Sequence, residues 1–88
     1  MVAVLSIEWY YKYMNIERFE FSEIFQQNLD GTLSPKVRLN VNGIEFGLGV
    51  SFSPGVSFGG VDFFKYIGVP IAAEKQGDIY ILKGFYQN

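Results

Sequence analysis

Acidic side chains are the residues best suited to chemistry in this sequence, because the chain contains no histidine and no cysteine. General acid–base catalysis would depend on its nine Asp and Glu side chains. Glu17, Glu20 and Glu23 recur at every third position. They would share one face of a helix but divide between the two faces of a strand. We interpret them as solvated residues rather than a glycosidase-like carboxylate pair, and we predict no enzymatic activity.

Any metal site would have to use oxygen ligands. Asp30, Asp62 and Asp78 are far apart in sequence, and each adjoins a glycine or a helix cap position rather than a calcium-loop spacing. We interpret them as turn and cap residues, and we expect no metal and no cofactor. Gly59 and Gly60 precede Asp62 at a predicted helix start, where free N–H groups can bind an anion. Because Asp62 would repel one, we favour a plain helix start.

Aromatic side chains are abundant, at 18% of the chain, with nine Phe, six Tyr and one Trp. Each large ring buries about 150–250 Å², which is more apolar surface than a thin β-domain of 88 residues readily hides. We therefore expect either an exposed aromatic patch or, preferably, a second copy that covers it. The candidate interaction surface combines three aromatic residues, of which Tyr10 and Tyr80 are predicted to face outward, with residues of two loops: Trp9, Tyr10, Tyr80, Ser53, Pro54, Gly55, Gly59, Gly60 and Asp62.

The charge pattern excludes some classes of partner. The formal net charge is −2, and no run of Lys or Arg provides the basic surface of a nucleic-acid binder. No apolar run approaches the roughly 20 residues of a membrane span, and the first residues lack the basic region of a signal peptide. We expect a cytoplasmic protein with no nucleic-acid and no membrane partner.

The clearest structural signal is Asn42-Gly43, which is typical of a type I′ hairpin turn. The predicted register places apolar pairs on one face and polar or glycine pairs on the other: Val41–Ile44, Leu39–Phe46 and Val37–Leu48, against Asn40–Glu45 and Arg38–Gly47. We expect the second strand to continue to Phe52. The loop Ser53-Pro54-Gly55, whose turn type stays open, would then set Phe52 opposite Val56 and Val50 opposite Phe58.

The remaining elements are predicted from periodicity. Residues 5–13 alternate as a strand, residues 14–18 turn, and a second strand runs from Phe19, facing Tyr13, past Phe25. A short helix after Ser22 as N-cap is the alternative for residues 22–29. Residues 29–35 read as a loop, and residues 62–67 as a short helix. The last hairpin sets Ile71 and Ala73 opposite Ile81 and Ile79 across the loop 74–78.

Together these patterns predict one all-β, or β-rich α+β, domain over residues 1–88. It has about six strands in a largely antiparallel meander and one short helix near residues 62–67. The favoured function is a non-catalytic module that self-associates, as a homo-oligomer, and presents residues 53–62 or an aromatic face to a protein partner. The alternative is a small-ligand (carbohydrate-like) binding domain that uses exposed aromatic residues.

Overall fold

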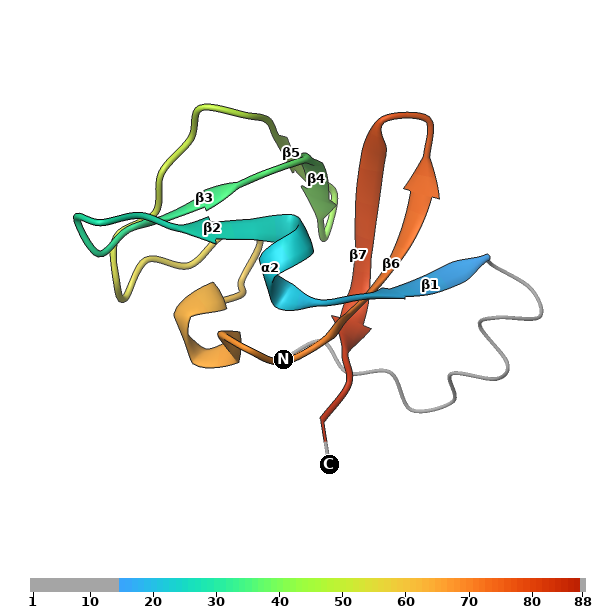
Figure 1. Ribbon diagram of the computed structural model, residues 1–88. Coiled ribbons are helices and arrows are strands. Elements are labelled where there is room, and N and C mark those ends of the chain that lie inside the picture. The colour runs from blue at the N-terminus through green and yellow to red at the C-terminus, as the bar shows by residue number, and fades with distance from the viewer. Residues whose placement is uncertain (1–14, 88) are drawn as a thin grey trace.

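The computed structural model describes residues 15–87, so Trp9, Tyr10 and the strand predicted over residues 5–13 lie outside the described residues. Within these described residues, seven strands form two sheets, and Figure 1 shows how they are arranged. The larger sheet has the order β1-β6-β7-β4-β5 and the smaller one pairs β2 with β3. The strands are β1 (Ile16–Phe19), β2 (Phe25–Gln27), β3 (Leu33–Pro35), β4 (Arg38–Val41), β5 (Ile44–Phe46), β6 (Ile71–Gln76) and β7 (Ile79–Phe85). The helical elements are the single turn α2 (Phe21–Ile24) and the 3-10 helix η1 (Phe63–Tyr66).

The β-rich class is confirmed, and the pairing is mostly antiparallel. Among the described strands, β4 and β7 are the pair that runs parallel, so the larger sheet is mixed. Among residues 15–87, no helix has the length and apolar character needed to cross a membrane.

The β4–β5 hairpin forms around the predicted turn. Asn42 and Gly43 have φ values of 51° and 86°, as a type I′ turn requires. The side chain of Asn40 accepts a hydrogen bond from the Gly43 amide at 3.0 Å. Leu39 pairs with Phe46, and the other two inner pairs are also as predicted.

The outer half of this hairpin was predicted wrongly. The strand β5 ends at Phe46, and Leu48 is 67% exposed instead of continuing the buried face. Gly49 has a φ of 90°, so the chain turns away there. Arg38 pairs with Ile79 of β7 rather than with β5. Glycines on the strand's outer face gave it too little propensity to continue.

A turn forms at the predicted loop 53–55, but the predicted pairing across it is wrong. The Val56 amide donates to the Ser53 carbonyl at 3.1 Å. Pro54 occupies the second position and Gly55, with a φ of 87°, the third, which is the arrangement of a type II turn. Phe52 pairs with Leu33 instead of Val56.

Phe58 likewise pairs with Val61 rather than with Val50. Phe58 and Val61 exchange two backbone hydrogen bonds of 2.8 Å, so Gly59-Gly60 closes a tight turn. The φ values of Gly59 and Gly60 are 56° and 80°, which again fits type I′. The predicted helix follows directly, as η1, and its N-cap Asp62 accepts a hydrogen bond from an amide of the first turn.

The region before residue 36 also needs correction. The strand β1 occupies residues 16–19, where a turn was predicted, and Phe19 pairs with Ile71 of β6 rather than with Tyr13. Residues 21–24 form one helical turn capped by Glu20, not Ser22, and the chain continues as β2. Residues 33–35, predicted as loop, form β3, which pairs with β2.

The final hairpin has a different register from the predicted one. Gln76 pairs with Ile79 across a two-residue turn, so the strands extend through residues 74–76. Gly77 has a φ of 62°, which suits the first central position of a type II′ turn. Ala73 therefore faces Leu82 and not Ile79, and a bulge follows before Ile71 meets Phe85.

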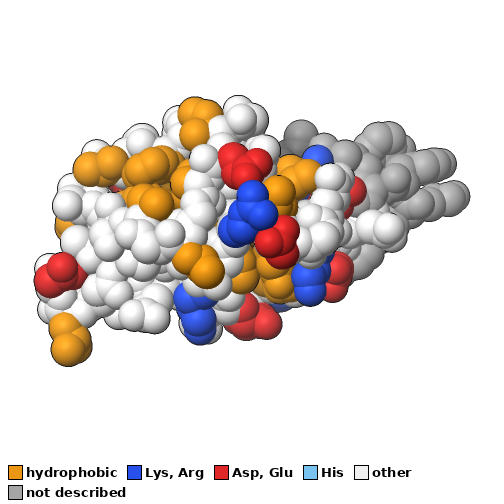
Figure 2. Space-filling view, turned by 90° about the horizontal axis from the view of Figure 1, so that it is seen from above, with side chains coloured by type: hydrophobic (Ala, Val, Ile, Leu, Met, Phe, Trp, Pro, Cys, Tyr) orange, Lys and Arg blue, Asp and Glu red, His pale blue; other side chains and the backbone are white. Residues whose placement is uncertain are grey.

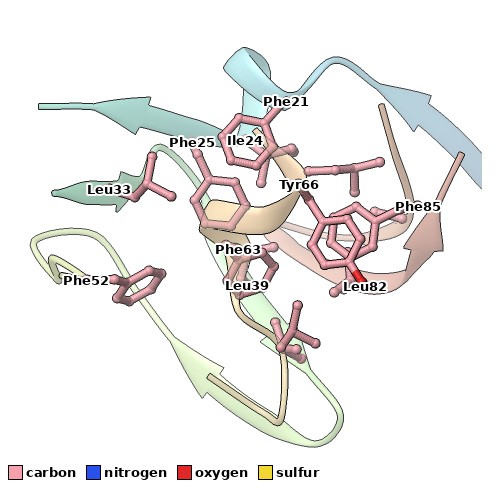
Figure 3. Close-up of a cluster of buried hydrophobic side chains, with 14 of the residues drawn as sticks. Phe21, Ile24, Phe25, Leu33, Leu39, Phe52, Phe63, Tyr66, Leu82 and Phe85 are labelled. Carbon is pink, nitrogen blue, oxygen red and sulfur yellow. The ribbon is translucent and has the colours of Figure 1, made fainter. Parts of the chain in front are cut away.

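A single hydrophobic cluster joins the two sheets and the helical turns (Figure 3). Phe25 of β2 lies 4.7 Å from Phe63 of η1 between ring centroids. Tyr66 stacks on Phe85 of β7 at 3.9 Å. Phe52 contacts Phe46 of β5 edge-on at 5.3 Å. Aromatic rings from five segments thus form the centre of the core.

Candidate functional site

The structure does not bring the predicted surface residues into one site. Trp9 and Tyr10 lie outside the described residues. Ser53, Pro54 and Gly55 form an exposed turn. Gly60 and Asp62 line a small hollow of about 220 Å³ beside η1, Gly59 lies partly buried just before it, and Tyr80 lines a separate, larger groove.

The larger groove, which we call the Leu48 groove, has a volume of about 370 Å³. It lies where the start of β4, the segment after β5 and the β6–β7 turn meet. Its lining residues are Val37, Arg38, Leu48, Lys75, Gly77, Asp78 and Tyr80. The groove therefore has apolar walls from three segments and charged groups along its sides.

Arg38 fixes the polar side of the Leu48 groove. One guanidinium nitrogen, Nη1, donates to both carboxylate oxygens of Asp78 at 3.2 and 3.1 Å. The other, Nη2, donates to Oε1 of Glu45 at 2.7 Å. The hydrogen bonds that Arg38 donates to Asp78, and then the one that it donates to Glu45, raise the pKa of Arg38. This bridge ties the β6–β7 turn to the β4–β5 hairpin, and it uses both carboxylates.

Lys75 supplies a second cation at the same groove. Its Nζ lies 5.5 Å from the centroid of the Tyr80 ring. Tyr80 is half-buried and packs edge-on against Phe19 at 5.2 Å. Within residues 15–87, no carboxylate forms an ion pair with Lys75. The ammonium group is therefore available to an anionic group that enters the groove.

The tip of the β2–β3 hairpin was missed by sequence reasoning, which treated residues 29–35 as loop. Leu29 is 108% exposed, the highest value among the large apolar side chains of the described chain. The flanking Asn28-x-Asp30-Gly31 sequence is a turn signal, and it could have identified Leu29 as a residue presented at a hairpin tip.

Hydrogen bonds hold this tip on both sides of Leu29. The Asn28 amide donates to the Thr32 carbonyl at 2.8 Å. The Asn28 side chain donates to the hydroxyls of Thr32 and Ser34 at 2.9 and 2.8 Å. Oδ1 of Asp30 accepts from the Thr32 amide at 3.0 Å and from its hydroxyl at 2.6 Å. These bonds from Thr32 lower the pKa of the Asp30 carboxyl.

The three aspartates have the turn and cap roles that were predicted. Asp30 holds the β2–β3 tip, Asp62 caps η1 with a 3.1 Å bond from the Phe64 amide, and Asp78 lies in the β6–β7 turn. Glu20 and Glu23 form a capping box at α2. In the described part of the chain, no group of three or more Asp or Glu residues could hold a metal ion.

Comparison of this chain with models of protein families, with curated proteins and with solved structures finds no match.

Proposed function

We propose that this protein is a non-catalytic protein-interaction module that self-associates. The observation that carries the proposal is the exposure of large apolar side chains over residues 15–87. These residues are Leu29 (108%), Leu48 (67%), Ile44 (52%), Val56 (44%) and Ile67 (40%). A singly exposed apolar residue is ordinary on a protein surface. However, two leucines on turns, one fully and one two-thirds exposed, cost solvation free energy that a partner can recover.

Two further properties support association. Only 18% of the residues are charged, while 49% are hydrophobic. Figure 2 shows several groups of hydrophobic side chains on the face seen from above, with Lys, Arg, Asp and Glu side chains among those near the middle. Charged residues are depleted at the centres of protein interfaces, so a surface of this composition suits contact with another protein.

The test is the molar mass of the full chain in solution, measured by light scattering and sedimentation over a wide concentration series. We expect a mass that rises with concentration above that of the 10.0 kDa chain. A constant monomer mass up to the solubility limit would contradict self-association.

The second candidate function is binding of a small apolar-faced ligand, such as a carbohydrate, in the Leu48 groove. The groove volume of about 370 Å³ falls in the range of ligand pockets, and Tyr80 lines it. Titration with a panel of mono- and disaccharides, followed by the ring NMR signals of Tyr80, tests this function. Unchanged signals would eliminate it for the sugars tried.

A further inference from the structure

Leu29 and the Leu48 groove are two surfaces of opposite shape on the same chain. Leu29 is a fully exposed side chain at a hydrogen-bonded hairpin tip. The groove is a hollow with apolar walls from Val37, Leu48 and Tyr80. In Figure 1 the tip of the β2–β3 hairpin and the turn between β6 and β7 point in different directions. Since Leu29 is fully exposed, it does not fill the groove of its own chain.

We propose that Leu29 of one copy inserts into the Leu48 groove of a second copy, with the Asp30 carboxylate beside the Lys75 ammonium group. This inference rests on the proposed self-association and names the two surfaces that carry it. The occupant of the groove is therefore a second copy of this chain.

The volume of the groove and the hydrogen bonds that hold both surfaces favour this contact. A cavity of roughly 150 Å³ already admits benzene, so a groove of about 370 Å³ can accept a leucine side chain and part of its turn. Hydrogen bonds of Asn28 and Asp30 already hold the tip, and the bridge made by Arg38 holds one wall of the groove. Neither surface has to be ordered on binding, which reduces the entropic cost of association.

Charge complementarity favours the same contact. Asp30 adjoins Leu29, and only its Oδ1 oxygen accepts a hydrogen bond from the described residues. Lys75 has no ion pair there, whereas Asp78, the acidic residue of the groove, is bonded to Arg38. An aspartate that arrives beside Leu29 would thus meet the Lys75 ammonium group, which has no carboxylate partner among the described residues, while Asp78 is held by Arg38.

The contact joins two different surfaces. A two-fold dimer could make it twice, with each Leu29 in the partner's groove, and otherwise it would build a head-to-tail chain. Either arrangement predicts that a copy defective in one surface can still pair with a copy defective only in the other.

The experiment is a complementation test with Leu29→Asp and Leu48→Asp. Both side chains are exposed, so urea denaturation of each variant should match the native chain. We expect each variant alone to be monomeric in sedimentation at concentrations where the native chain associates. An equimolar mixture should form a 1:1 complex, because Leu29 of the Leu48→Asp copy can enter the intact groove of the other.

Ser22→Asp is the matched control, since it adds the same charge at an exposed position of α2, at the opposite end of β2 from Leu29, and Ser22 does not line the Leu48 groove. It should associate as the native chain does. Leu29→Ala should raise the dissociation constant about 10- to 100-fold, as expected for a leucine that becomes buried on binding. In a double-mutant cycle, Asp30→Asn and Lys75→Gln should weaken association less than additively.

The outcomes separate the inference from the proposed function. A monomeric native chain would overturn both. A native chain that associates, with Leu29→Asp still associating, would overturn the inference and leave self-association standing. Loss of association in Ser22→Asp, or failure of the two defective variants to pair, would likewise overturn the contact between Leu29 and the groove.

Discussion

Gly59 lies against the backbone of the β4–β5 hairpin in a way that no other residue type would permit. Its φ is 56°, and an added Cβ would lie 2.5 Å from the Val41 carbonyl oxygen and 2.8 Å from Cγ1 of Val41. The Gly59 carbonyl accepts a hydrogen bond from the side chain of Asn42 at 2.6 Å. The two glycine-containing turns are therefore packed directly against each other.

Gly59→Ala should lower the free energy of unfolding by about 2–4 kcal/mol, because left-handed backbone strain adds to a steric clash. Urea denaturation measures the loss. Gly60→Ala is the control: Gly60 has a φ of 80° but no atom within 4 Å of an added Cβ. It should cost only the backbone strain, about 1–2 kcal/mol. Equal losses in the two variants would contradict the close approach to Val41.

The Asp30 carboxyl should titrate below the ordinary Asp value of about 3.9, because hydrogen bonds from the Thr32 hydroxyl and amide favour its charged form. The folded-state pKa is lowered, so this group stabilises the protein above pH about 3.9, and its contribution disappears as the pH falls through the lower folded value. An NMR titration of the Asp30 carboxyl carbon measures the pKa. Thr32→Val, which removes the hydroxyl donor, should raise it, and an unchanged value would contradict the bond.

Among the individual elements, the sequence correctly predicted those turns and caps that depend on neighbouring residues alone. Asn42-Gly43 determined both the turn type and the inner pairs of β4–β5, because a two-residue turn fixes the register on both sides of it. Asp62 caps η1, and this helix lies within the predicted residues 62–67. The predicted register of β6–β7 was wrong because residues 74–76 have the polar composition of a loop. In the structure they extend β6 to a two-residue turn at Gly77-Asp78.

Non-local pairing limited the rest of the prediction. β1 pairs with β6, and β4 runs parallel to β7, across sequence separations that no local pattern specifies. The same limit applied to the candidate site. Tyr80 was predicted to face outward, and Lys75 is its partner in the β6–β7 hairpin. Leu48 joins them only because distant segments meet at one groove.

Asp62 is the N-cap of η1. The Asp62 side chain accepts a 3.1 Å hydrogen bond from the Phe64 amide. Asp62→Ala should therefore cost about 1 kcal/mol of unfolding free energy, the usual loss for an N-cap. Asp62→Asn keeps the acceptor oxygen and should stay close to the native value. Hydrogen exchange at the Phe64 amide measures the local effect, and equal protection in both variants would rule out the cap.

At the scale of the whole molecule, Phe52 connects the two sheets. Its backbone exchanges hydrogen bonds with Leu33 of β3 at 3.0 and 2.8 Å. Its ring, only 1% exposed, contacts Phe46 of β5 and Phe58, at 5.3 and 4.0 Å between centroids. The smaller sheet has two short strands, and a lone two-stranded ribbon is marginal in water. It therefore depends on this contact for its stability.

Truncating Phe52 should consequently destabilise both sheets together. Phe52→Ala should lower the free energy of unfolding by about 3–5 kcal/mol, which is close to the total stability of a marginal domain. Phe52→Leu should lower it by only about 1–2 kcal/mol. The leucine variant therefore stays folded and can be measured. Native-state hydrogen exchange should then show the same loss of protection in β2–β3 as in β4–β5. Val56→Ala, in the neighbouring exposed turn, should change neither. If only β2–β3 lost protection, the sheets would be separate folding units, and the aromatic cluster would not be what joins them.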